Sequence, residues 1–68
     1  MEIFQKRLKQ ERLACRLTQR DMADRLRIAQ PSYIRYENGS SEPTLEKLAA
    51  IADILDVSVD YLLGREEF

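Results

Sequence analysis

The sequence predicts an all-α fold, a single compact domain of five short helices. Apolar residues recur at the three- and four-residue spacing of amphipathic helices, and no stretch alternates apolar and polar residues as a strand would. The length of 68 residues suits one domain, which we expect to span residues 1–68. The hydrophobic content of 44% is ordinary for a globular protein and argues against disorder.

Composition narrows the class of protein further. No apolar run approaches the roughly 20 residues of a membrane span, and none resembles the core of a signal peptide. The single Cys15 cannot form an internal disulfide, which fits a cytoplasmic protein. Histidine is absent and Cys15 has no soft ligand beside it, so we expect neither a metal site nor a cofactor. The lack of histidine and of a Gly-rich phosphate loop argues against an enzyme.

Charge is distributed unevenly along the chain. The net charge of −1 seems to oppose binding to a polyanion. However, residues 5–36 carry nine Lys/Arg and three acidic residues, a net charge of +6. Residues 37–68 carry two Lys/Arg and eight acidic residues, a net charge of −6. A nucleic acid would meet the basic half. Long solvated helices can also produce such a split by chance, so charge alone leaves both interpretations open.

The first helix is expected over residues 2–14. Phe4 and Leu8 lie one turn apart, and Arg12 and Cys15 extend the same stripe. We therefore expect Cys15 to be a small buried side chain rather than a reactive thiol.

A second helix is expected to begin at Thr18. Thr18 and Asp21 resemble a capping box with aspartate in place of glutamate. The helix must end before Pro31, because proline disfavours helical geometry in the preceding residue unless a new helix starts there. The expected inner face consists of Met22, Ala23 and Leu26.

The segment from Gln30 to Glu37 predicts a third, short helix. Pro31 is acceptable in its first turn, where a backbone N–H would lack an intrahelical partner. Tyr33 and Tyr36 fall on one face, and Gly39 suits the left-handed residue that ends a helix. The Asn-Gly pair does not indicate a hairpin, since no alternating strands flank it.

Two more helices are expected after a polar loop. Thr44 caps a fourth helix, and Ser58 caps a fifth that runs through Tyr61 and stops at Gly64. The apolar face expected for the fourth helix consists of Leu45, Leu48, Ala49, Ile51, Ala52 and Leu55.

The second and third helices are joined by about three residues, so they must cross steeply, as in a helix-turn-helix unit over residues 18–37. The second helix of such a unit enters the major groove of DNA. From Phe4 to Gly64 the chain resembles the Cro-like (XRE-type) helix-turn-helix family of phage-type and bacterial repressors. The segments "RLTQRDMADRL", "IAQPSYIRYENG", "SEPTLEKLAAIADIL" and "VSVDYLLG" carry the resemblance. It implies a lambda-repressor-like domain.

The resemblance also implies DNA-contacting residues. Gln30 can hydrogen-bond an adenine edge, and Arg35 can hydrogen-bond a guanine edge. The alternative for Gln30 is a solvated surface amide. The alternative for Arg35 is a phosphate contact or a surface role. Asn38 is expected either to contact a phosphate or only to cap the helix. The implied base-reading positions are Gln30, Pro31, Ser32 and Arg35. The implied phosphate-contacting positions are Gln19, Asn38 and Ser40, with Arg16 and Arg20 as electrostatic support.

Other positions have implied structural roles. Arg12 and Glu37 resemble the family's ion pair between the first helix and the end of the third. Tyr33 and Tyr36 occupy the family's core positions, with base stacking as the alternative. Ile34 replaces a residue that is usually small and polar, and it faces either solvent or DNA. The chain also departs from the family. Arg16, Arg27 and Asp56 stand where glycine is common, at helix ends expected to need left-handed geometry, and Ala29 stands where a Ser/Thr cap is common.

We therefore expect a sequence-specific, double-stranded-DNA-binding transcriptional regulator, a repressor acting as a homodimer on a palindromic operator. Alternatives are an antitoxin or coregulator that uses its acidic half to bind a protein, and the DNA-binding half of a larger ligand-sensing regulator. The expected dimer surface, which offers apolar area, consists of Val59, Tyr61, Leu63 and Phe68. For Val59, Leu63 and Phe68 the alternative is a core position or an isolated exposed apolar residue.

Overall fold

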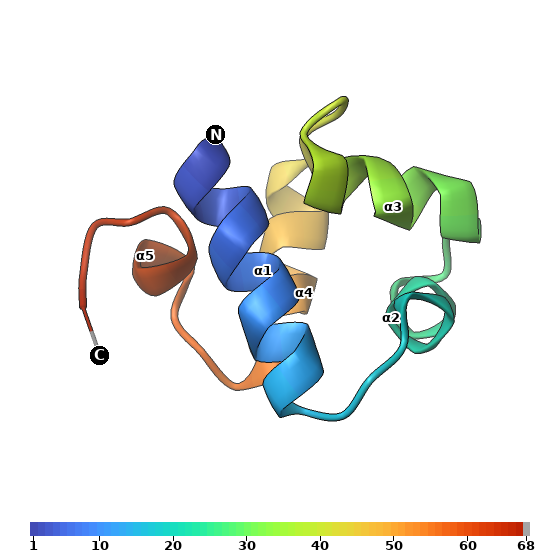
Figure 1. Ribbon diagram of the computed structural model, residues 1–68, viewed down its shortest axis with the longest axis horizontal. Helices are drawn as coiled ribbons and strands as arrows, with labels where there is room; N and C mark the ends of the chain where they lie inside the picture. The colour runs from blue at the N-terminus through green and yellow to red at the C-terminus, as the bar shows by residue number, and fades with distance from the viewer. Residues whose placement is uncertain (68) are drawn as a thin grey trace.

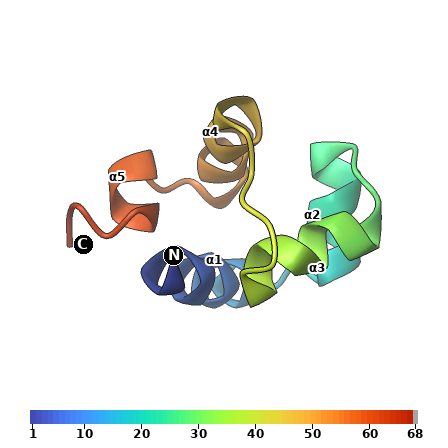
Figure 2. The same cartoon turned by 90° about the horizontal axis from the view of Figure 1, so that it is seen from above.

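The computed structural model describes residues 1–67, which form five helices and no strand. The helices are α1 (Glu2–Ala14), α2 (Gln19–Leu26), α3 (Gln30–Asn38), α4 (Leu45–Leu55) and α5 (Val59–Leu62). The all-α prediction is confirmed, and each predicted helix is present. In Figure 1, α1 crosses the middle of the molecule, with α2 and α3 on one side and α5 on the other. Figure 2 shows that α4 and α5 cover the face of the molecule opposite α1 and α3.

Polar side chains begin three of the helices as predicted. Thr18 Oγ1 accepts a hydrogen bond from the Asp21 backbone N–H at 2.9 Å, and Asp21 Oδ2 accepts one from the Thr18 N–H at 2.8 Å. This capping box lowers the pKa of Asp21, because the backbone N–H of Thr18 stabilises the carboxylate. Thr44 Oγ1 and Ser58 Oγ each accept one hydrogen bond, from the backbone N–H of Lys47 at 3.1 Å and of Tyr61 at 2.9 Å, and so cap α4 and α5 without the reciprocal bond. Ala29 supplies no such bond to α3, whose first turn holds a proline.

Three non-glycine residues adopt the left-handed conformation at helix ends. Arg16, Arg27 and Asp56 have φ values of 58°, 57° and 55°. The resemblance to the helix-turn-helix family implies glycine at these positions, and each side chain costs ~1–2 kcal/mol in this conformation. Gly39, with φ of 85°, ends α3 without that cost, as predicted.

All five helices contribute to one apolar core. Tyr33, Leu8, Met22, Ile51 and Leu62 are its largest fully buried side chains. The predicted inner face of α2 is buried, and so are both tyrosines of α3, whose rings meet edge to face with centroids 6.2 Å apart. No helix within residues 1–67 has the length and apolar character needed to cross a membrane.

Three burial predictions are wrong. Cys15 is exposed, because α1 ends at Ala14 and the helical stripe does not continue past it. Leu45 and Ala49 are also exposed, although the apolar pattern of α4 suggested an inward orientation. They lie one turn apart on the outer side of α4, where no other helix covers them, and Leu45 keeps 86% of its surface exposed.

Candidate nucleic-acid interface

The connection between α2 and α3 is short and firmly held. Arg27 takes the left-handed conformation, and the Ile28 N–H then donates to the Ala23 carbonyl at 3.0 Å. Ile28 is half-buried against the core, so it fills the junction between the two helices. Lys47 of α4 donates from Nζ to the Leu26 carbonyl at 2.7 Å and caps the end of α2. This lysine contact had no signal in the sequence.

One side of α3 faces the core and the other faces solvent. Tyr33 and Tyr36 are buried, whereas Gln30, Pro31 and Arg35 are exposed. Ser32, the fourth position implied in base reading, is half-buried. Pro31 and Arg35 therefore lie on the side of α3 away from the tyrosines, and Gln30 lies at the exposed edge of that side. Ser32 precedes Tyr36 by one turn and lies nearer the buried side. In Figure 1, α3 and α5 lie on opposite sides of α1.

The positions implied in phosphate contact differ in their exposure and in their hydrogen bonds within the domain. Arg16 and Arg20 are exposed and flank the start of α2. Gln19 is half-buried, and its Nε2 donates to Glu37 Oε1 at 3.2 Å. Asn38 Oδ1 accepts from the backbone N–H of Ser40 at 2.9 Å and from its Oγ at 2.7 Å, so Asn38 shapes the loop after α3.

Arg12 and Glu37 form an ion pair away from water. Arg12 Nε lies 2.6 Å from Glu37 Oε2, and Nη2 lies 3.2 Å from Oε1, so the pair is bidentate. The two side chains are only 7% and 5% exposed. Arg12 Nη1 also donates to the Leu17 carbonyl at 2.8 Å, which ties the loop after α1 to the same group.

The Glu37 carboxylate joins three helices. It accepts hydrogen bonds from Arg12 of α1, Gln19 of α2 and the hydroxyl of Tyr33 in α3. Burial by itself would raise the pKa of Glu37, but the bonds from Arg12, Tyr33 and Gln19 outweigh it and lower that pKa. Burial and the carboxylate raise the pKa of the Tyr33 hydroxyl. Glu37 is therefore charged at neutral pH and fixes α3 against α1 and α2. The sequence suggested the ion pair but not the tyrosine hydroxyl.

The positions considered for a dimer surface differ in burial. Val59 and Leu63 are half-buried at the edge of the core. Tyr61 is 7% exposed, contrary to the expectation that it offers apolar surface. The Arg7 guanidinium lies 4.4 Å from the centroid of the Tyr61 ring, and the Tyr61 hydroxyl donates a hydrogen bond to Glu11 Oε2 at 3.1 Å. Both partners belong to α1, so Tyr61 is held against that helix. Phe68 lies outside the described residues.

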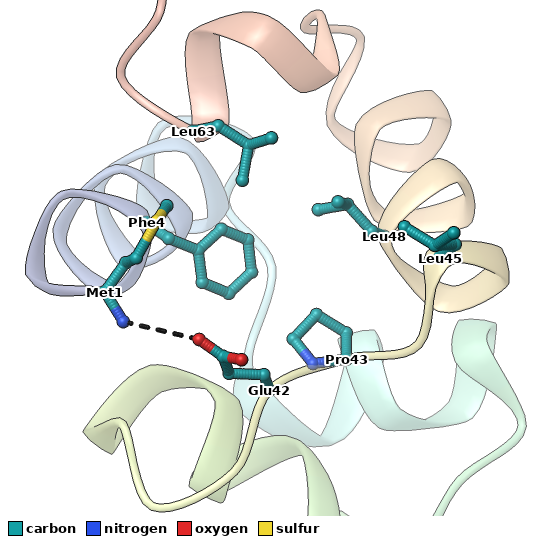
Figure 3. A pocket seen from close by; sticks show the side chains of 7 residues that line it. All are labelled: Met1, Phe4, Glu42, Pro43, Leu45, Leu48 and Leu63. Carbon is teal, nitrogen blue, oxygen red and sulfur yellow. Dashed lines mark ion pairs between the residues drawn. The ribbon is translucent and has the colours of Figure 1, made fainter.

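An apolar hollow of 260 Å³ opens between the start of α1, the start of α4 and α5 (Figure 3). The Met1 amino group and Glu42 face one another across its rim at 3.8 Å. The highly exposed Leu45 stands beside it. The lining residues are Met1, Phe4, Glu42, Pro43, Leu45, Leu48 and Leu63.

Comparison with known proteins agrees with this geometry, since a family model described as helix-turn-helix matches residues 8–62. The chain belongs to the helix-turn-helix family. It is 50% identical to YqaE, an uncharacterised HTH-type transcriptional regulator of Bacillus subtilis, over 94% of this chain and 55% of that protein. It is 46% identical to RstR, the cryptic phage CTXphi transcriptional repressor of Vibrio cholerae, over 91% of this chain and 55% of the repressor.

A third relative, the HTH-type transcriptional regulator AnsR of Bacillus subtilis, is 51% identical over 66% of this chain and 39% of its own length. The chain thus spans about half the length of the curated relatives YqaE and RstR. The predicted resemblance to helix-turn-helix repressors is confirmed at the level of the family.

Proposed function

We propose that this helix-turn-helix domain is a sequence-specific, double-stranded-DNA-binding transcriptional regulator that inserts α3 into the major groove. The observation that carries the proposal is the division of α3 into two sides. Tyr33 and Tyr36 anchor one side in the core, and Gln30 and Arg35 are exposed on the other. The names of YqaE, AnsR and RstR, two transcriptional regulators and a repressor, support it.

In this proposal the exposed side of α3 discriminates between bases. The Gln30 amide can donate and accept at an adenine edge, and the Arg35 guanidinium can donate twice to a guanine, each worth ~1–3 kcal/mol of discrimination. Ser32 and Pro31 lie beside them in the first turn. The network around Glu37 supports such specificity, because it holds α3 in one orientation relative to the rest of the domain.

Phosphate contacts would set the register of α3 in the groove. The first backbone N–H groups of α2 favour an anion, and the exposed Arg16 and Arg20 flank them. We propose that Gln19 contacts a phosphate through the part of its amide that Glu37 does not occupy, and that Asn38 and Ser40 present the loop after α3 to the next phosphate.

Selection of binding sequences from random duplex DNA tests the proposal. We expect one sequence class to be enriched, with affinity that falls as salt rises. Gln30→Ala and Arg35→Ala should relax preference at particular bases, whereas Gln19→Ala should weaken all sequences about equally. Exposed residues of the same type outside the interface, Gln10 and Arg65, provide matched alanine controls that should leave both affinity and preference unchanged. If the selection enriched no sequence, the proposal would be refuted.

We further propose that the domain acts as a dimer on a palindromic operator and represses transcription. The exposed Leu45 beside the apolar hollow supports such a contact, and the half-buried Val59 and Leu63 extend it. Sedimentation should show a dimer on operator DNA that Leu45→Ser weakens, and a monomer at high micromolar concentration, free and DNA-bound, would refute it. Because its proposed ligand is DNA, we place the protein in the cytoplasm.

The same hollow and exposed leucine favour one other candidate, an antitoxin or coregulator that binds a partner protein. Co-purification of a stoichiometric partner, without salt-dependent affinity for DNA, would support this candidate over the first.

A further inference from the structure

Ile34 is an apolar residue on the outward side of α3. It follows Gln30 by four residues and Pro31 by three, so it lies about 40° and about 60° from them around the helix. The buried Tyr36 lies about 160° away. Ile34 is half-buried, but within the described part of the chain it does not belong to the apolar residues that pack against the core. Core formation therefore does not account for an isoleucine at this position.

Pro31 and Ile34 together form an apolar strip one turn long. Pro31 is exposed, and the polar Gln30 and Arg35 lie on either side of the strip. In the major groove, base edges present hydrogen-bonding groups and one apolar group, the C5 methyl of thymine. The same methyl position is filled in 5-methylcytosine and empty in cytosine and uracil. An apolar strip between two hydrogen-bonding side chains matches a methyl between two polar base edges.

We propose that Ile34, with Pro31 beside it, contacts the C5 methyl of a thymine and selects for pyrimidines that carry this methyl. The inference rests on the proposed function and adds a recognition element that hydrogen bonding cannot supply. Burying one methyl group corresponds to about a fourfold gain in affinity, the equivalent of ~0.8 kcal/mol. The expected discrimination for thymine over uracil is thus modest in one half-site. In a palindrome the factors of the two half-sites multiply.

Replacing single thymines of the selected operator by deoxyuridine tests the proposal, because this removes the methyl and keeps every hydrogen-bonding group. The wild-type domain should lose about fourfold in affinity at one or two thymines of each half-site. Ile34→Ala should bind thymine and uracil equally at those positions, and Ile34→Val should retain most of the discrimination. Leu13→Ala, which truncates an exposed apolar residue of α1, is the matched control and should discriminate as the wild type does.

Restoring the methyl elsewhere gives an independent measurement. Where cytosine replaces the contacted thymine, 5-methylcytosine should bind the wild type better than cytosine does, and Ile34→Ala should not distinguish them. Equal wild-type affinity for thymine and uracil throughout a half-site overturns the proposal, as does a uracil penalty that persists undiminished in Ile34→Ala. In both outcomes the operator is still selected, so the proposed function survives. If no sequence is selected at all, both fail. Circular dichroism verifies that each variant is folded.

Discussion

Replacing Arg12 by methionine tests whether the buried ion pair holds the domain together. The guanidinium makes two hydrogen bonds to Glu37 and one to the Leu17 carbonyl, and it is 7% exposed. Water therefore screens the pair little. Methionine fills much of the space but leaves Glu37 charged, and among residues 1–67 its remaining side-chain hydrogen bonds come from Gln19 and Tyr33.

The expected loss is large compared with the stability of the domain. Removing one partner of a buried ion pair costs ~3–5 kcal/mol, because a charge is stranded away from water. A domain of 68 residues has a total free energy of unfolding of roughly 3–10 kcal/mol at ~0.05–0.15 kcal/mol per residue. Arg12→Met should therefore lose a large share of the free energy of unfolding of the domain.

Urea unfolding followed by circular dichroism measures this loss. Arg65→Met is the matched control, because its guanidinium is 76% exposed and lies 3.9 Å from Asp60. Its expected cost is at most ~1 kcal/mol. Adding Glu37→Gln to Arg12→Met should cost less than the two single changes together, since no charge is then stranded. Equal losses for Arg12→Met and Arg65→Met, or strict additivity in the double variant, would refute this reasoning.

Acid should destabilise the domain through Glu37, whose pKa is lowered on folding. The unfolded state then binds the proton more readily, so the free energy of unfolding should fall as pH drops below the ordinary glutamate pKa of about 4.3. Glu37→Gln should show a shallower fall, and parallel plots of the free energy of unfolding against pH for the two proteins would contradict this. Asp56→Gly should stabilise by about 1 kcal/mol because it relieves a left-handed φ of 55°, whereas Asp53→Gly within α4 should destabilise by about 1 kcal/mol. Urea unfolding that gives both changes the same sign would exclude this explanation. Gly39→Ala, at φ of 85°, should cost ~1–2 kcal/mol in the same assay. The new Cβ would lie 2.3 Å from Gln5 Nε2, but that flexible side chain can move away. If adding Gln5→Ala restored the stability, the clash and not the backbone conformation would be responsible for the loss.

The helix ends were predictable because their signals are local. Thr18, Thr44 and Ser58 each bond a backbone N–H three residues away, and Gly39 stands immediately after α3. The left-handed positions were also anticipated, although there the prediction came from family resemblance and not from the residue type.

Burial was less predictable because it depends on what covers a residue. Periodicity correctly indicated that Tyr33 and Tyr36 share the buried side of α3. It failed for Leu45, which belongs to an apolar pattern but lies where no neighbouring helix reaches. It failed for Cys15 because the helix that defines the pattern stops one residue earlier.

The sequence alone specified the order of the five helices, the side-chain caps of three of them, and the buried side of α3 that carries both tyrosines. These features depend on hydrogen bonds and side-chain spacing within a few residues, whereas the side chains proposed to read DNA came from family resemblance. The tertiary structure specified that Glu37 binds groups from three helices, that Lys47 closes the end of α2, and that Tyr61 lies under Arg7. These contacts join residues far apart in the chain, so they exist only after the helices have packed, and no local pattern records them.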